Sequence, residues 1–100
     1  MQTNDRFLEF DEVERAMLFR AMFARRMSAL NEFKQIVSKK GYDRKRAAKI
    51  CAEAATLQLL TMEIAQPLLL DEKTLKLLEP TEQEKVFFEV QSELQARRLS

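Results

Sequence analysis

The side chains that could act as nucleophiles in this sequence are one cysteine and a few serines. Ser28, Ser38, Ser92 and Ser100 have no histidine anywhere in the chain, so no imidazole can take a proton from their hydroxyls. Cys51 lacks the same partner, and the pattern places it on a packed helix face, where cysteine is typically a small core residue. We therefore expect no nucleophilic catalysis.

Paired carboxylates offer a second chemistry, that of acid–base work or metal binding. Glu79 with Glu82, and Glu89 with Glu93, have helical spacing on a polar face, which is typical of solvated surface. A di-iron helical bundle requires Glu-x-x-His pairs, and the chain contains no histidine. We expect no metal, no cofactor and no enzymatic activity.

The strongest polar signal is a cluster of basic residues around Gly41. The net charge of residues 34–49 is +6, against −1 for residues 1–33 and −4 for residues 50–100. Such a cluster can neutralise nucleic-acid phosphates, meet an acidic groove on a partner protein, or remain in solvent. Because the sequence pI is only about 7.8, we favour protein or solvent over nucleic acid.

The strongest apolar signal lies between Ala16 and Ala24, where Arg20 is the only polar residue. In a helix these side chains cover nearly the whole circumference, and such a helix must be covered on all sides. We expect the Met17 side to be core and the opposite side to face a partner. The residues predicted to bind protein are Phe19, Met22 and Phe23, together with Lys39, Lys40, Arg44, Lys45 and Arg46 of the basic turn.

These residues must be positioned by helices, because 100 residues with one Gly and two Pro cannot supply the turns of a sheet protein. Capping signals predict one all-α domain over residues 1–100, with a first helix beginning near Asn4 or Asp5 and ending at Lys39 or Lys40. Further helices are expected over residues 43–66, 72–79 and 81–98, with Gly41 as a left-handed cap.

The apolar faces of these helices predict how they pack. Ala47, Cys51, Ala54 and Ala55 form a small-residue face that should bring the first two helices together as a long antiparallel hairpin. The last helix should pack through one stripe and face water on the other side. The other three helices, two of which are short, cannot cover the apolar segment of the first helix as well as their own stripes. We therefore expect a homodimer or a surface for another protein. The stripe of the last helix comprises Val86, Phe87, Val90 and Leu94.

Pro67 follows the second predicted helix and is a candidate conformational switch. X-Pro bonds in folded proteins are cis in only about 5–6% of cases, so a trans linker is the default. An isomer change between Gln66 and Pro67 would nevertheless redirect the C-terminal half of the chain.

The chain resembles the small anti-RecBCD proteins of temperate Salmonella phages in its size, its helical character and the segment Gln66-Pro67-Leu68-Leu69-Leu70. The resemblance implies a cytoplasmic phage protein that binds the RecC subunit of the host RecBCD recombination nuclease. It also implies an altered nuclease and Chi response, and dependence on a host prolyl isomerase acting at Pro67.

We thus predict a non-catalytic protein that modulates a larger protein by occupying its surface. One alternative is a dimeric DNA-binding regulator that uses residues 39–49, and another is a small helical secretion or assembly chaperone. No apolar run approaches the ~18 residues of a membrane span, so we expect no membrane insertion.

Overall fold

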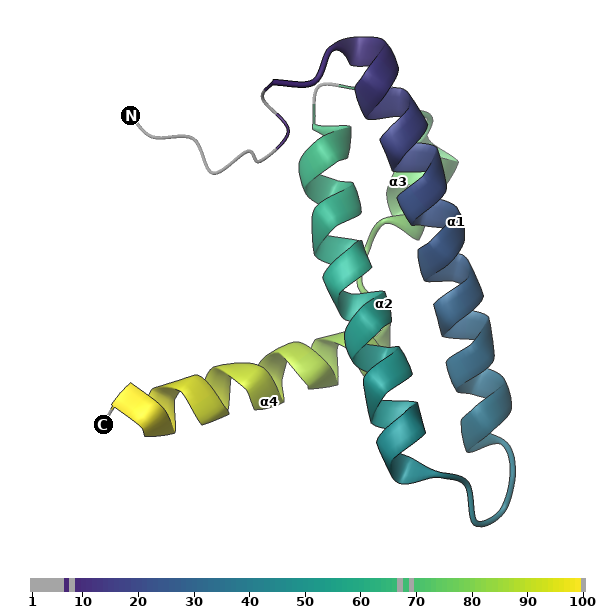
Figure 1. Cartoon of the computed structure of the whole chain (residues 1–100), viewed down its shortest axis with the longest axis vertical. Coiled ribbons are helices and arrows are strands. Elements are labelled where there is room, and N and C mark those ends of the chain that lie inside the picture. Colours follow the sequence, from purple (N-terminus) through teal and green to yellow (C-terminus); the bar gives the residue numbers. More distant parts are fainter. Residues whose placement is uncertain (1–6, 8, 67, 69, 100) are drawn as a thin grey trace.

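The computed structural model describes residues 7, 9–66, 68 and 70–99, and these residues form four helices and no strand (Figure 1). The helices are α1 (Glu12–Val37), α2 (Arg44–Ala65), α3 (Glu72–Leu77) and α4 (Glu82–Leu99). The predicted all-α class is therefore confirmed. Figure 1 shows α1 and α2 side by side as a long antiparallel hairpin, with α3 drawn behind its upper half in this view and α4 running crosswise away from it.

The start of α1 is set by a capping box. The Asp11 carboxylate accepts a hydrogen bond from the Glu14 backbone N–H at 2.8 Å, and the Glu14 side chain accepts one from the Asp11 N–H at 2.9 Å. The predicted start near Asn4 or Asp5 is wrong, because the described residues before Asp11 are not helical. Asn4 and Asp5 themselves lie outside the described residues. The box satisfies two backbone donors that have no partner within the helix, and so favours helix entry here.

The turn between α1 and α2 follows the predicted glycine. Gly41 has a φ of +70°, the left-handed conformation that glycine adopts without steric cost. Asp43 then caps α2 by accepting the backbone N–H groups of Lys45 and Arg46. The predicted end of the first helix, at residue 39 or 40, lies beyond the observed end. The Ser38 N–H still donates to the Lys34 carbonyl, but the Lys39 N–H donates to the Ile36 carbonyl, three residues back, as in a 3₁₀ turn.

The remaining helix ends agree closely with their capping signals. α2 ends with Gln66 as its cap, and α3 begins after Asp71, which accepts the Thr74 N–H at 2.8 Å. Before α4, the Thr81 N–H donates to Glu84 at 2.8 Å while the Glu84 N–H donates to the Thr81 hydroxyl at 3.3 Å. The predicted capping box is therefore present.

The hairpin is closed by small side chains. Ala47, Ala54 and Ala55 of α2 and Ala29 of α1 are all buried, which confirms the predicted small-residue face except at Cys51, which is only partly buried. Small residues let two helix axes approach closely, so backbone proximity replaces large interdigitating side chains over this part of the hairpin.

Large side chains fill the opposite end of the hairpin. Phe19 of α1, Ile64 of α2 and Leu78 after α3 form the buried cluster together with the smaller Ala65 of α2. The partly buried apolar residues packed against it are Phe7, Leu18, Met22, Phe23, Leu68 and Leu70. Leu68, Leu70 and Leu78, which follow α2 in the chain, therefore cover α1 on this side.

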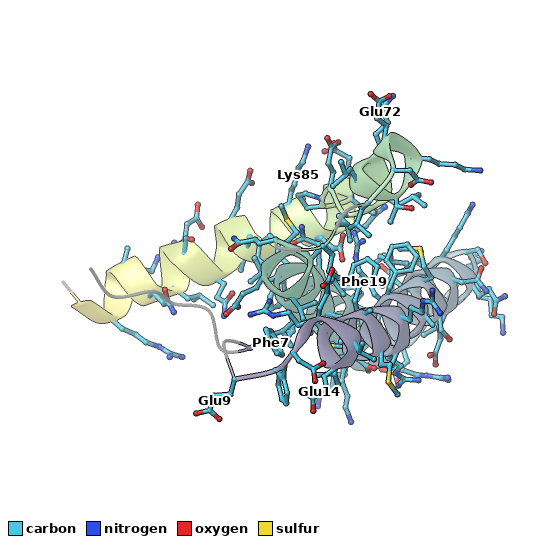
Figure 2. All side chains as sticks on the ribbon, turned by 90° about the horizontal axis from the view of Figure 1, so that it is seen from above. Phe7, Glu9, Glu14, Phe19, Glu72 and Lys85 are labelled. Atoms are coloured by element: carbon cyan, nitrogen blue, oxygen red, sulfur yellow. The ribbon has the colours of Figure 1, made fainter. Side chains whose placement is uncertain are left out.

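The two sides of α1 are the reverse of the sequence prediction. Phe19 is 6% exposed and Figure 2 places it toward the middle of the molecule, whereas Met17 is 68% exposed. Met17 and Phe19 are two positions apart, and such residues are separated by about 200° around the axis of an α-helix. When Phe19 faces Leu78, Met17 therefore points outward. The expectation that the Met17 side is core and that Phe19 faces a partner is wrong.

The predicted packing of α4 is also wrong for most of its stripe. Val86, Val90 and Leu94 are 56%, 49% and 48% exposed, and only Phe87 is partly buried. The helix contacts α2 near its own start and then leaves the hairpin (Figure 1). The radius of gyration is 15.4 Å, against about 13 Å for a compact chain of this length, which reflects this protruding arm.

Candidate protein-docking surface

The position of α4 is set by a buried arginine of α1. Arg26 and Glu84 are both 0% exposed, and the Arg26 guanidinium donates to the two Glu84 carboxylate oxygens at 3.0 and 2.7 Å. The same guanidinium donates to the backbone carbonyls of Leu77 at 2.6 Å and of Glu79 at 3.0 Å. One side chain therefore binds α1 to the end of α3, the connecting loop and the first turn of α4. We call this group of contacts the Arg26 junction.

An apolar groove opens beside the Arg26 junction. It measures about 500 Å³ and lies between the two long helices and the first half of α4. Almost all of its lining surface is apolar, and nothing within the described chain covers it. We call this hollow the α4 groove; its lining residues are Phe33, Ala48, Cys51, Gln83, Val86, Phe87 and Val90.

A second hollow continues the α4 groove along α1. It measures about 330 Å³, and it shares Phe33 and Gln83 with the α4 groove. Lys34 and Val37 extend it toward the end of α1, where the basic turn begins. The apolar surface therefore runs from α4 toward the most positively charged part of the chain.

Cys51 lies within the α4 groove and is not activated there. Its Sγ is 3.6 Å from the Gln83 carbonyl oxygen, to which the thiol donates. Burial, and to a lesser extent the negative charge of Glu84, raises the pKa of the Cys51 thiol. A raised pKa keeps the sulfur protonated near neutral pH, which is opposite to what a nucleophilic cysteine requires.

The basic side chains around Gly41 are all exposed. Arg46 pairs with Glu32 at 2.9 Å, and within the described residues it is the only member of the cluster with a salt bridge. The charge of this region is therefore largely uncompensated by the rest of the fold. We call this set the basic cluster: Lys34, Lys39, Lys40, Arg44, Lys45, Arg46 and Lys49.

The structure does not bring the predicted binding residues together. Phe19 is in the core, and Met22 and Phe23 are partly buried against it, with the rings of Phe19 and Phe23 stacked at 5.6 Å between centroids. From Phe19 to the end of α1 at Val37 the helix rises about 27 Å, so the aromatic residues are far from the basic turn. Pro67, the predicted switch, lies outside the described residues.

The α4 groove consists largely of residues that sequence reasoning assigned to the interior. The stripe containing Val86 and Val90 is present in the sequence as a regular helical pattern, which predicts a core-facing side rather than an exposed one. Phe33 and Ala48 carry no pattern of their own. The available signal is that the predicted helices are too few and too short to cover every apolar face. This predicts an exposed apolar surface but does not show on which helix it lies.

A smaller exposed apolar patch lies at the other end of α1. It is lined by Val13, Ala16 and Met17 with the flanking charges Glu12 and Arg20, and it measures about 400 Å³. Val13 is 69% exposed. All its lining residues belong to one helix, so it lacks the two-sided form of the α4 groove.

Comparisons with known proteins add no relative. No family model, curated protein or solved structure matches this chain.

Within the described residues, no group of three or more acidic, cysteine or histidine side chains could hold a metal ion. The helices of that same part of the chain are too short or too polar to cross a membrane.

Proposed function

We propose that this protein is a non-catalytic binding module that acts by docking the α4 groove onto a larger protein. The observation that carries the proposal is the groove itself: a two-sided apolar surface of about 500 Å³ on an arm that a buried ion pair holds in place. Exposed apolar patches of this kind on small proteins mark interaction sites.

The chemistry near the groove supports binding over catalysis. The chain has no histidine, and the only thiol has its pKa raised by burial. The Arg26 and Glu84 side chains are occupied with each other and with backbone groups, so neither is available to a substrate. Aromatic side chains such as Phe33 and Phe87 are instead enriched in the core of protein interfaces.

The partner that we propose is the RecBCD nuclease, bound through its RecC subunit, with an altered nuclease activity and Chi response as the consequence. This choice rests on the resemblance to small anti-RecBCD proteins of temperate phages. The same resemblance carries the proposal that a host prolyl isomerase acts on Pro67. Docking and isomerisation are separate steps, and the experiment below tests docking.

The test uses purified RecBCD, the full chain and two matched variants. We expect the wild type to co-elute with RecBCD in size-exclusion chromatography and to change the ATP-dependent degradation of linear duplex DNA with or without Chi. Val90→Asp places a charge in the groove and should weaken binding at least ~10-fold, about 1.4 kcal/mol. Val13→Asp changes an equally apolar exposed residue at the other end of α1 and should bind as the wild type does.

Two results would contradict this proposal. One is the absence of any complex and of any change in nuclease activity at micromolar protein. The other is equal loss of binding in the Val90 and Val13 variants, which would place the contact outside the groove.

A dimeric DNA-binding regulator is the second candidate, because the basic cluster is exposed and, among the residues that the structure describes, only Arg46 of the cluster has an ion-pair partner. This function predicts affinity for random duplex DNA that falls steeply with salt. Electrophoretic mobility shifts with the wild type and with Lys39→Glu, Lys45→Glu measure it directly, and salt-insensitive or absent binding excludes it.

A further inference from the structure

We infer that the occupant of the α4 groove is an acidic amphipathic helix of the partner protein. Its apolar residues enter the groove and its carboxylates face the basic cluster. The inference rests on the proposed function, which supplies a protein partner, and it adds the chemistry that the partner must present.

The form of the groove fits a helix. The two smallest lining side chains, Ala48 and Cys51, come from α2, while the larger Phe33, Phe87 and Val90 come from the flanking helices. The surface is therefore recessed over α2 between two apolar walls. Helices bind such grooves through anchors spaced three, four and seven residues apart.

The length of the groove fits the same spacing. From Gln83 to Val90 α4 rises about 10 Å, and from Gln83 to the exposed Leu94 about 16 Å. This corresponds to two to three turns of a docked helix. A segment presenting apolar residues at positions i, i+4 and i+7 would cover the exposed stripe.

The charge around the groove selects an acidic helix. Lys34 lines the hollow that continues the groove along α1. On α2, Arg44 and Lys45 lie about one turn before the groove residue Ala48. Residues 34–49 carry a net charge of +6, and Arg46 is the member of the basic cluster that has an ion-pair partner in the described structure. At the end of the groove that faces residues 34–49, carboxylates of a partner helix would be attracted and oriented, whereas basic side chains would be repelled.

The same charges disfavour a second copy of this chain as the occupant. Two copies related by a two-fold axis through α4 would pair their α4 helices in antiparallel orientation. Arg97 and Arg98 at the end of one α4 would then approach the acidic first turn of the other at Glu82, and the charges of the basic cluster would stay uncompensated. Nucleic acid would satisfy the basic cluster but would leave the apolar groove uncovered.

The experiment uses the full chain and two fluorescein-labelled helical peptides of about 16 residues with identical leucine positions. One peptide carries glutamate on its polar face and the other carries lysine. Fluorescence anisotropy should show at least ~10-fold tighter binding of the acidic peptide at low ionic strength, with a smaller difference in about 0.5 M NaCl.

Cys51 provides a reporter located in the groove, because it is the only cysteine in the chain. Bound acidic peptide should slow the reaction of Cys51 with a thiol reagent such as Ellman's reagent. The reaction is followed above neutral pH, since burial raises the pKa of this thiol. Protection by the acidic peptide and not by the lysine peptide would locate binding in the groove.

Three variants test the contacts. Val90→Asp and Ala48→Phe should each reduce acidic-peptide affinity at least ~10-fold, the first by charge and the second by filling the recess without charge. Val13→Asp is the matched control and should leave the affinity unchanged. Replacing Lys39 and Lys45 together by glutamate should remove the preference for the acidic peptide.

The inference is overturned if both peptides bind equally, if Cys51 is not protected, or if Ala48→Phe binds as tightly as the wild type. It is also overturned if light scattering shows a dimer of the wild type that Val90→Asp dissociates, because a second copy then fills the groove. If RecBCD binds through the groove while the acidic peptide does not, the inference falls and the proposed function stands. If the peptide binds and RecBCD does not, the proposed partner falls and the acidic-helix inference stands.

Discussion

Two neighbouring regions of α4 reverse the usual distribution of polar and apolar side chains. Glu84 carries a charge and is 0% exposed, whereas Val86, two residues later, is apolar and 56% exposed. The first belongs to the Arg26 junction and the second to the α4 groove. The charged side chain at the root of α4 therefore holds the helix in place, and the apolar side chains beyond it remain available to a partner.

The physical difference between the two regions is whether the chain itself supplies partners for the polar groups and cover for the apolar surface. In the Arg26 junction the guanidinium and the carboxylate bond to each other and to backbone groups, and no buried polar side-chain atom in the described structure lacks a partner. In the α4 groove the apolar surface stays in contact with water. Because a buried ion pair is weak evidence for stability, we interpret the junction as a device that orients α4 and hence shapes the groove.

The largest expected effect concerns the Arg26 junction. Arg26→Ala should lower the free energy of unfolding by about 3–5 kcal/mol, because it leaves Glu84 buried without its countercharge. Urea denaturation followed by circular dichroism measures this. The double variant Arg26→Met, Glu84→Leu should recover part of the loss, although the Leu77 and Glu79 carbonyls still lack their donor. A change below about 1 kcal/mol in the single variant would show that the pair does not hold α4.

The second expected effect concerns the α4 groove and is small for stability. Val90→Asp should change the free energy of unfolding by no more than about 0.5 kcal/mol, since the side chain is half-exposed and Val and Asp have similar helix propensities. The same denaturation experiment measures it, with Val13→Asp as the control. A loss as large as that of Arg26→Ala would mean that the groove is part of the core.

The smallest expected effect concerns the adjacent arginine. Arg25 pairs with Glu53 at 2.5 Å, and the hydrogen bond and then the charge of Glu53 raise the pKa of Arg25. Its side chain is nevertheless 59% exposed, so solvent screens the pair. Arg25→Ala should leave the urea midpoint unchanged. A clear shift would show that the contrast between buried and exposed pairs on α1 is weaker than the geometry indicates.

Much of the fold was predictable because the ends of helices are determined by interactions between residues close together in the sequence. The caps at Asp43, Asp71 and Thr81 and the left-handed Gly41 each depend on interactions within a few residues, and all four are present. The start of α1 is harder to predict, because several early residues are suitable N-caps. The capping-box spacing of Asp11 and Glu14 was the signal that decides it.

The candidate site was less predictable because it depends on which apolar faces remain uncovered. Phe19 and Val86 both belong to apolar stripes in the sequence, yet the first is buried and the second is exposed. The difference arises because Leu68, Leu70 and Leu78 pack in the cluster around Phe19, while α4 turns away from the hairpin (Figure 1). The local sequence pattern does not determine which of the two apolar stripes is buried against another part of the chain.

The sequence by itself determined the helical class, the helix caps, the close pairing of α1 with α2 through alanines, and the basic turn. The helical class, the caps and the basic turn follow from side chains near one another in the chain, and the alanine face of α2 predicts the helix pairing because small side chains allow close approach. Tertiary structure alone decided the pairing of Arg26 with Glu84, 58 residues apart, and with it the direction of α4 and the position of the groove. A long-range ion pair forms only when the fold removes both charges from water together, and adjacent residues cannot encode that condition.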